Sequence, residues 1–466
     1  MSLDSVFIVG IGGAGMSGLA RLLHAQGLNV AGSDAKDSKR LAALRSEGIK
    51  VFVGHDASHL LDDSGRLEYQ TIAASTAVPK SNPEIAEGLE LGATVLSRAE
   101  LLAKIIANHD VIAVAGTHGK TTTTSMLTVG LQAANLDPAF AIGSELNELG
   151  SNAHLGSGSF FVVEADESDG TFLELGAKFG IVTNLEADHL NYWETLEKLQ
   201  AGFLKFALDI SDRGGFVVVC GDDVGAKELA EIARAKSADV RTYGLSENVD
   251  YQIELLGITG IGYRYRIPKL DLEVQLQVPG EHNVLNSVAA ILVASGIGAN
   301  LHKVVEGIQS FTGTKRRFDF KGEVGGVRVF DDYAHHPTEI AATLKAARAV
   351  AGSGRVIAAF QAHHYYRTAL FSKEFGEALA LADAVVVLEV FAPGETFIPG
   401  ASGETLAANV SLPKSQVIFQ PSWSQVAEDL VNFAQPGDIV LTLGAGEIGL
   451  LTSDVLRLLL DKFPKA

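Results

Sequence analysis

The stretch that decides the fold runs from residue 111 to residue 124 and reads VIAVAGTHGKTTTT. An apolar run of strand type leads into glycines, then into Lys120 and Thr121, and a helical pattern follows. Glycines allow several backbone N–H groups to face one anion, and a helix N-terminus adds its positive end. The stretch therefore predicts a phosphate-binding loop in which Lys120 reaches the β- and γ-phosphates and Thr121 ligates Mg²⁺. The full pattern has a glycine where Val114 stands, so a plain strand-to-helix turn is the alternative.

Similar short apolar runs recur along the chain, and many of them end in glycine. They are rich in Val, Ile or Phe, as strands buried on both faces of a parallel sheet are. Helical patterns lie between them, and alternating residues in 248–278 indicate antiparallel strands. The alternation predicts an α/β fold. The apolar runs are 6–9, 111–114, 160–163, 180–182, 216–219, 356–360, 384–390 and 439–443.

The composition limits the classes of function. A length of 466 residues indicates about three domains, which we place at 1–108, 109–316 and 317–466. The chain has 37 Lys and Arg against 56 Asp and Glu, a net charge of −19, which argues against nucleic acid as the main partner. One cysteine, Cys220, rules out a disulfide within the chain. With neither a signal-peptide pattern nor a membrane-spanning apolar run, we expect a cytoplasmic protein without a membrane partner.

The first glycine loop lies near the start of the chain. Residues 10–15 read GIGGAG, a G-x-G-x-x-G pattern that follows an apolar run and precedes a helical pattern. Asp34 stands at the end of the next apolar run, where a dinucleotide-binding unit places an acid. The loop predicts binding of a diphosphate, but it does not distinguish NAD from another nucleotide. Glycines that serve only helix–strand packing are the alternative.

Two acidic segments follow apolar runs in the middle of the chain, residues 160–169 and 181–189. Ligands bind at the carboxyl ends of the strands in an open α/β sheet, so both segments are expected beside the phosphate loop. Mg²⁺ prefers oxygen ligands, which makes Glu164 a partner for Thr121. Only Glu164 and His189 are assigned a function on position alone. The alternative for these acids is that they are solvated helix starts.

Further candidates lie toward the C-terminus. Asn283 precedes an alanine-rich helical pattern and could read an adenine edge or cap that helix. The basic run 315–317 could bind phosphate or lie in solvent. Residues 331–339 and 361–368 each follow an apolar run, and Arg367 could hold a carboxylate. A surface loop is the alternative for 361–368.

These motifs together resemble the Mur ligase family over nearly the whole chain. GTHGKTT at 116–122 is specific for the family. GIGGAGM at 10–16 and DDYAHHPT at 331–338 resemble its alanine-adding branch. The segments 164–169, 183–189 and 315–318 also match its pattern.

The resemblance implies three domains. The first is Rossmann-like, the second is a P-loop ATPase-type α/β domain with a mostly parallel sheet, and the third is again Rossmann-like. It implies that UDP-N-acetylmuramate, Mg-ATP (or Mn-ATP) and L-alanine are the substrates, and that an acyl phosphate forms on the lactyl carboxylate. The implied UDP-sugar-binding residues are Gly12, Gly13, Ala14, Gly15, Ser33 and Asp34. The implied ATP-binding residues are Gly116, Thr117, His118, Gly119, Lys120, Thr121, Thr122, Asn283, Arg317 and Asp332. Lys120, Glu164 and His189 are the implied catalytic residues, Thr121, Glu164 and His189 the metal ligands, and His363 and Arg367 the amino-acid-binding residues.

The chain departs from the family pattern in the third domain. The family commonly reads FQPHRY where residues 360–365 read FQAHHY, so Ala362 and His364 change this segment. Three alternatives to the alanine-adding activity stay open at this point. They are a recycling ligase that adds a tripeptide to the same nucleotide sugar, an NAD-dependent dehydrogenase and a non-catalytic nucleotide-binding module. A monomer or a homodimer is expected.

Overall fold

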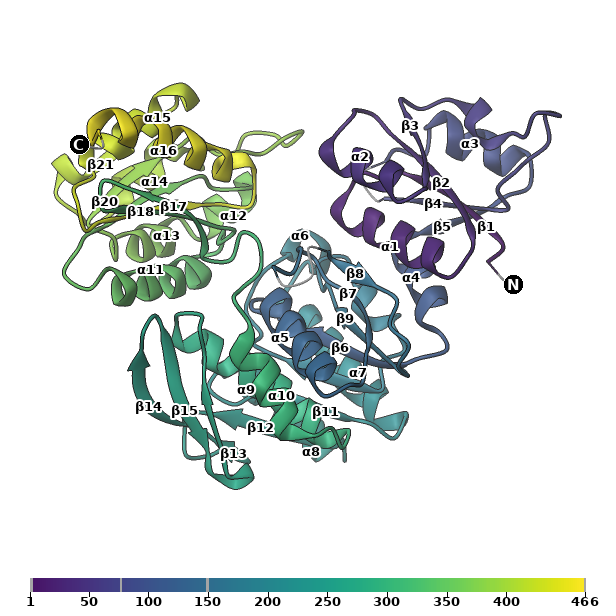
Figure 1. Cartoon of the computed structure of the whole chain (residues 1–466), viewed down its shortest axis with the longest axis horizontal. Coiled ribbons are helices and arrows are strands. Elements are labelled where there is room, and N and C mark those ends of the chain that lie inside the picture. Colours follow the sequence, from purple (N-terminus) through teal and green to yellow (C-terminus); the bar gives the residue numbers. More distant parts are fainter. Residues whose placement is uncertain (1–2, 76–77, 148–150, 465–466) are drawn as a thin grey trace. The chain divides into compact units, whose positions relative to one another are not determined.

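The computed structural model describes residues 3–75, 78–147 and 151–464. They form two compact units, Met1–Glu254 with Ile267–Leu272 and Leu285–Ser310, and Leu255–Arg266 with Glu273–Val284 and Phe311–Ala466. The fold is mixed α/β with mostly parallel sheets, as the alternation of strand and helix patterns predicts (Figure 1). The domain boundaries at 108 and 316 stay predictions.

The first sheet has five parallel strands in the order β3-β2-β1-β4-β5. From β1 the chain forms β2 and β3 on one side of β1, and then β4 and β5 on the other side. The loop after β1 therefore lies where the strand order reverses. Ligands of open α/β sheets bind at such a point. The strands are β1 (Ser5–Val9), β2 (Asn29–Asp34), β3 (Lys50–Val53), β4 (Thr71–Ala74) and β5 (Thr94–Ser97), and the helices are α1 (Ala14–Ala25), α2 (Lys39–Ser46), α3 (Pro83–Glu90) and α4 (Arg98–Ile106).

The second sheet has eight strands in the order β13-β12-β11-β10-β6-β9-β7-β8, parallel except between β7 and β8. Its strand order reverses at β6, which places the second glycine loop at another expected binding position. The strands are β6 (Asp110–Ala115), β7 (Ala139–Ala141), β8 (Ala153–His154), β9 (Phe160–Glu164), β10 (Phe179–Val182), β11 (Phe216–Cys220), β12 (Val240–Gly244) and β13 (Tyr251–Gln252). The helices of this part are α5 (Lys120–Ala133), α6 (Leu190–Trp193), α7 (Leu196–Asp212), α8 (Val224–Ala235), α9 (Glu281–Gly296) and α10 (Leu301–Ser310).

Helices on both faces bury the middle strands of this sheet. Helix α5 packs against β6 and β9, and α7 packs against β10 and β11 (Figure 1). Every residue of β11 is buried, Cys220 among them. Strands covered on both faces need apolar side chains in each position, which explains the continuous apolar runs of the sequence. A smaller sheet follows with strands β14 (Glu254–Thr259), β15 (Gly262–Ile267) and β16 (Leu272–Gln275).

The fourth sheet has six strands in the order β17-β18-β22-β19-β20-β21, antiparallel only between β17 and β18. Asp332 and Phe360 both pair with Leu443, so the loops after β18, β19 and β22 leave the same edge. The strands are β17 (Asp319–Val324), β18 (Val327–Asp332), β19 (Val356–Phe360), β20 (Ala384–Val387), β21 (Val417–Phe419) and β22 (Ile439–Leu443). The helices are α11 (Pro337–Ala351), α12 (Tyr365–Leu370), α13 (Ser372–Leu379), α14 (Gly403–Asn409), α15 (Trp423–Phe433) and α16 (Leu451–Lys462).

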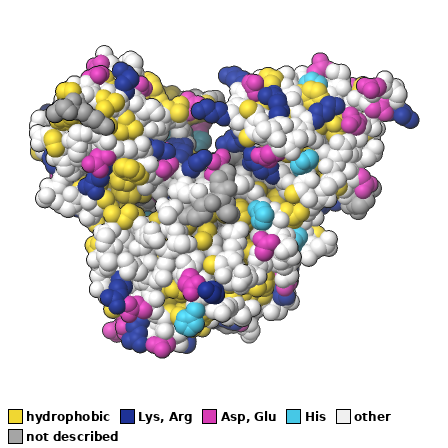
Figure 2. All heavy atoms as spheres, viewed as in Figure 1, with side chains coloured by type: hydrophobic (Ala, Val, Ile, Leu, Met, Phe, Trp, Pro, Cys, Tyr) yellow, Lys and Arg dark blue, Asp and Glu magenta, His cyan; other side chains and the backbone are white. Residues whose placement is uncertain are grey.

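One face of the molecule shows how its charged side chains are distributed. On the face drawn in Figure 2, acidic side chains lie among basic and hydrophobic ones instead of forming one large acidic area. Of the helices that the structure describes, none combines the length and the apolar character needed to cross a bilayer.

Candidate functional site

Two glycines shape the loop between β6 and α5. Gly116 has a φ of +129°, and a Cβ there would lie 2.1 Å from Thr183 Oγ1. Gly119 has a φ of +82°, and a Cβ there would lie 2.6 Å from the side-chain oxygen of Asn286. Positive φ is strained for residues with a Cβ, so both positions require glycine for conformation and for space.

The segment after β10 is hydrogen-bonded to the loop between β6 and α5. The backbone N–H of His118 donates to the side-chain oxygen of Asn184 at 2.7 Å, and the Thr183 hydroxyl donates to the His118 carbonyl. Thr117 N donates to the carbonyl of Asn184 at 3.2 Å. The two sequence motifs that contain these residues thus form one structure at the carboxyl edge of β6 and β10.

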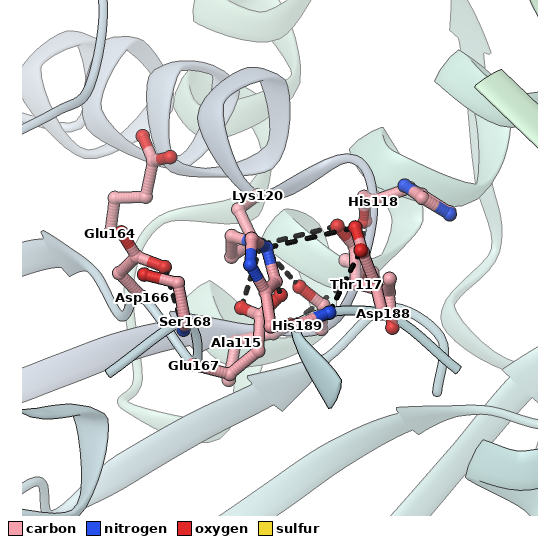
Figure 3. A network of polar contacts seen from close by, with 12 residues as sticks. Ala115, Thr117, His118, Lys120, Glu164, Asp166, Glu167, Ser168, Asp188 and His189 are labelled. Atoms are coloured by element: carbon pink, nitrogen blue, oxygen red, sulfur yellow. Dashed lines mark hydrogen bonds and ion pairs between the residues drawn. The ribbon is translucent and has the colours of Figure 1, made fainter. Parts of the chain in front are cut away.

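Lys120 lies at the centre of the polar network that this loop carries (Figure 3). Its ammonium group donates to the carbonyls of Gly116 at 2.7 Å and Thr117 at 3.2 Å, and it lies 2.7 Å from a carboxylate oxygen of Glu167. The side chains of Lys120 and Glu167 are 13% and 1% exposed. The loop therefore holds a buried cation, and this cation is the lysine that the sequence predicts to bind phosphate.

The carboxylates around Lys120 keep it charged. Burial by itself lowers the pKa of Lys120, but the charges of Glu167, Asp166 and Glu164 outweigh this and raise it above its ordinary value. Burial raises the pKa of Glu167 to about 7, with the Lys120 charge acting in the opposite direction. A charged lysine in a dry loop is what stabilisation of a transferring phosphoryl group requires.

Thr121 and Glu164 meet as the sequence predicts. The hydroxyl of Thr121 donates to one carboxylate oxygen of Glu164 at 3.0 Å, and the backbone N–H of Gly143 donates to the other at 2.7 Å. A Cβ at position 143 would lie 2.9 Å from the carboxylate, so a side chain there would crowd it. The carboxylate of Glu164 points away from Lys120 (Figure 3). These hard oxygen donors fit a divalent cation such as Mg²⁺.

His189 lies on the other side of the network. Its Nε2 is 3.6 Å from an oxygen of Asp188 and 3.9 Å from an oxygen of Glu167. Its φ of +53° places it at the start of α6 in the left-handed region. The structure thus groups His189 with Glu167 and Lys120 (Figure 3), whereas Thr121 is hydrogen-bonded to Glu164.

The first glycine loop is tied to its acidic partner. The backbone N–H of Gly12 donates to the Asp34 carboxylate at 2.9 Å, and Gly13 precedes the first residue of α1. Ser33 is fully buried, and its hydroxyl donates to Glu84 at 2.6 Å. Ser33 therefore turns its side chain into the domain, and its carbonyl accepts from the N–H groups of Gly10 and Ile11.

Asp332 sits at the end of β18 in a backbone cradle. Its two oxygens accept from the N–H groups of Phe318 and Ala334, each at 2.7 Å. The residue is 5% exposed, and burial raises the pKa of its carboxyl to about 6 while the Arg317 charge opposes this shift. Asp332 is therefore a buried carboxyl group at a strand end and not part of a solvated turn.

Arg317 and Asn283 belong to the same compact unit as Asp332. The Arg317 guanidinium lies 3.6 Å from Glu339 and over the Tyr333 ring at 5.2 Å. The Asn283 amide donates to the carbonyl of Pro279 at 2.7 Å. The predicted ATP-binding residues thus form two groups, one in each unit, with 116–122 in the first.

The segment after β19 carries the predicted amino-acid-binding residues. His363 and Arg367 are 9% and 2% exposed, so 361–368 is not a plain surface loop. Burial, followed by the charges of His364, Arg367 and Arg316, lowers the pKa of His363 to about 4. His363 is therefore a neutral imidazole near neutral pH.

Sequence reasoning missed Glu167 and Arg98. The interpretation of the acids as solvated helix starts is wrong for Glu167 and Asp188, which are 1% and 4% exposed. Arg98 begins α4, and its guanidinium lies 3.0 Å from where a Cβ on Gly15 would be. Burial raises the pKa of Asp166, but Lys120 and, less strongly, Arg98 help to lower it overall. A cation directly after the short segment 94–97, which reads TVLS, is the signal that could have identified Arg98.

Comparison with known proteins places three consecutive segments in one family. Residues 5–110 match "Mur ligase family, catalytic domain", residues 114–294 match "Mur ligase middle domain", and residues 316–446 match "Mur ligase, glutamate ligase domain". A UDP-N-acetylmuramate–L-alanine ligase of Acidothermus cellulolyticus is 53% identical over 97% of this chain and 94% of its own. One from Saccharopolyspora erythraea is 47% identical over 97% and 93%.

Solved structures of ligases match this chain over nearly its whole length. A UDP-N-acetylmuramate–alanine ligase of Thermotoga maritima matches with a TM-score of 0.80 at 27% identity, over 99% of this chain and 100% of that one. A murein peptide ligase of Psychrobacter arcticus matches with a TM-score of 0.70 at 25% identity, over 98% of each chain.

Proposed function

The chain belongs to the Mur ligase family, and from this premise we propose that it joins L-alanine to UDP-N-acetylmuramate in an ATP-dependent, ADP-forming reaction. The reaction is a step of peptidoglycan precursor synthesis. Relatives at 53% and 47% identity over nearly the full chain carry this activity in their names. The observation that carries the proposal in the structure is the buried Lys120 on its glycine loop, next to the Thr121–Glu164 pair.

The chemistry proceeds in two steps. The lactyl carboxylate attacks the γ-phosphorus of ATP, which releases ADP and forms an acyl phosphate. The neutral amine of L-alanine then attacks the activated carbonyl, and inorganic phosphate leaves from the tetrahedral intermediate. Lys120 stabilises the charge that develops on the γ-phosphoryl oxygens and exchanges its contact with Glu167 for one with phosphate.

Thr121 and Glu164 are the residues that would hold Mg²⁺, with His189 as a further ligand for a second ion. The hydroxyl and carboxylate oxygens already converge, and Gly143 leaves room beside them. When bound, a divalent cation would neutralise phosphate charge and orient the β- and γ-phosphates. Carboxylate oxygens of Asp188 and Glu167 lie 3.6 Å and 3.9 Å from the His189 ring nitrogen Nε2.

The first glycine loop would bind the diphosphate of the nucleotide sugar. The residues proposed for it are Gly12, Gly13, Ala14, Gly15, Ser33 and Asp34, with Arg98 as an additional cation beside Gly15. The N–H groups of residues 10–13 are already bonded within the domain, so the N-terminus of α1 is the part of this loop that suits an anion. The carboxylate of Asp34 already accepts a hydrogen bond from the backbone N–H of Gly12. This favours a role of Asp34 in shaping the loop over a role in binding the ribose of a nicotinamide dinucleotide.

The second unit would contribute the remaining contacts. Asn283, Arg317 and Asp332 are proposed for ATP, and His363 and Arg367 for the amino acid. The Arg367 guanidinium suits the substrate carboxylate, since a planar cation pairs with a carboxylate in two hydrogen bonds. Nucleotide substrates made inside the cell agree with a cytoplasmic location, and a monomer or homodimer stays a prediction.

An assay of ADP release tests the proposal. Purified protein with UDP-N-acetylmuramate and Mg-ATP is offered L-alanine, glycine, L-serine or the murein tripeptide L-alanyl-γ-D-glutamyl-meso-diaminopimelate. We expect L-alanine to give the highest kcat/KM and the tripeptide to give only background. Tripeptide-driven release without release by L-alanine would assign the recycling activity instead, and tight NAD binding without UDP-sugar binding would contradict both ligase functions.

A further inference from the structure

His364 has a backbone conformation that only an outside contact can hold. Its φ is +69° and its ψ is 126°, at the residue that immediately precedes α12. Residues with a Cβ rarely adopt this region, and such a strained conformation persists only where the surrounding structure enforces it.

Glu395 supplies that contact from a loop 31 residues further along the chain. One of its carboxylate oxygens forms an ion pair with Nδ1 of His364, and the other accepts from the backbone N–H of Tyr365 at 2.9 Å. The backbone N–H of His364 donates to the carbonyl of Phe391 in the same loop at 3.1 Å. We call the contacts of Glu395 with His364 and Tyr365 the clamp. The His364 and Glu395 side chains are 43% and 30% exposed, so the clamp lies at the surface of the domain.

The clamp determines where the residues on either side of it point. His363 forms a backbone bridge with Phe391, and their rings lie 5.1 Å apart. The Nε2 of His363 is buried and has no hydrogen-bond partner among the residues that the structure describes. It lies 2.5 Å from where a Cβ on Gly446 would be, so Gly446 leaves the space that this ring occupies. A buried nitrogen without a partner is costly and points to a ligand that supplies one.

We propose that Glu395 is a positioning residue for the amino-acid substrate. By holding His364 at positive φ it sets the direction of His363 on one side and Arg367 on the other. His363 Nε2 accepts a hydrogen bond from the substrate amine, and Arg367 pairs with the substrate carboxylate. The inference rests on the proposed function, because it takes His363 and Arg367 as the amino-acid-binding residues.

Steady-state kinetics of Glu395→Gln and Glu395→Ala test this role. We expect the KM for L-alanine to rise at least tenfold in Glu395→Ala and less in Glu395→Gln, which keeps one oxygen acceptor. The KM values for ATP and UDP-N-acetylmuramate should stay within twofold of wild type. Glu377→Gln is the matched control, since Glu377 is 63% exposed on α13 in the same domain and pairs only at 3.5 Å with Lys373.

A second variant separates positioning from general stability. Glycine adopts positive φ without strain, so His364→Gly removes the need for the clamp. Glu395→Ala should then raise the KM for L-alanine less than threefold in the His364→Gly background. Equal effects of Glu395→Ala in both backgrounds, or a parallel rise of all three KM values with a lower melting temperature, would overturn the proposal.

Failure of this inference differs from failure of the proposed function. If wild-type ADP release is driven by another amino acid, the assignment of L-alanine is wrong, and the same variants are compared with that amino acid. If L-alanine drives release and the KM for it is unchanged in Glu395→Ala, the positioning role alone is wrong.

Discussion

The ammonium group of Lys120 lies 2.7 Å from a carboxylate oxygen of Glu167, and the Glu167 side chain is 1% exposed. Lys120, for which we propose phosphate binding, is therefore paired with a buried carboxyl group in this structure. A phosphoryl group that enters the loop must compete with Glu167 for the same cation.

Replacement of Lys120 by Ala should abolish catalysis. The variant removes the cation that stabilises the transferring phosphoryl group, and loss of one such donor lowers kcat by about 10²- to 10³-fold. The measurement is L-alanine-dependent ADP release at saturating substrates. Lys205→Ala, at a 58% exposed position on α7, is the control and should retain wild-type kcat. Unchanged kcat in Lys120→Ala would contradict the assigned role.

The Thr121–Glu164 pair should determine the Mg²⁺ requirement. Thr121→Val keeps the shape of the side chain but removes the hydroxyl that donates to Glu164. We expect the Mg²⁺ concentration for half-maximal activity to rise about tenfold, in the range that loss of a metal-site contact produces. Thr121→Ser, which keeps the hydroxyl, should remain near wild type. An equal Mg²⁺ requirement in the two variants would count against a metal site at Thr121.

Gly116→Ala should distort the phosphate loop. A Cβ would lie 2.1 Å from Thr183 Oγ1, in addition to the strain of a φ of +129°. Gly176→Ala is the control for backbone strain alone, because Gly176 has a φ of +61° and open space around its Cβ position. Thermal unfolding should show about 1–3 kcal/mol of strain in Gly176→Ala and a larger loss in Gly116→Ala. The KM for ATP should rise only in Gly116→Ala, and similar kinetics in both variants would show that the loop tolerates a Cβ.

Asp332 should make the stability of the protein depend on pH. Its pKa rises from 3.8 to about 6 in the folded state. The folded state favours the protonated Asp332 carboxyl. Its contribution to the free energy of unfolding is therefore complete below about pH 3.8 and is lost as the pH rises through about 6. In Asp332→Asn this titration is absent. The free energy of unfolding of wild type minus that of the variant should therefore fall from about pH 4 to about pH 7, by at most roughly 3 kcal/mol.

Urea unfolding at several pH values measures this difference. Burial lowers the pKa of His282, in the same unit, to about 4, and its pH dependence has the opposite sign. Subtraction of the variant from the wild type removes that contribution, because His282 is present in both proteins. A difference that is constant or increases with pH would show that the Asp332 carboxyl ionises normally.

The local patterns of the sequence determined the fold class and the two glycine loops. A strand that is covered on both faces needs a continuous run of apolar residues. A turn that needs a positive φ, such as the one at Gly116, needs glycine. Both requirements come from short-range geometry. They can be recognised from neighbouring residues alone. The carboxyl ends of the strands were the expected position of both acidic segments, and the structure brings Thr121 to Glu164 there as expected.

The tertiary structure alone decided which of several equivalent side chains are buried and paired. Glu164, Asp166 and Glu167 look alike in the sequence, yet one contacts Thr121 and another meets Lys120 in a dry site. Glu395 reaches His364 across 31 residues, and nothing local marks that pair. The reason is physical: the free energy of a charge depends on its desolvation and on its nearest opposite charge, and both are set where distant parts of the chain return to the same place.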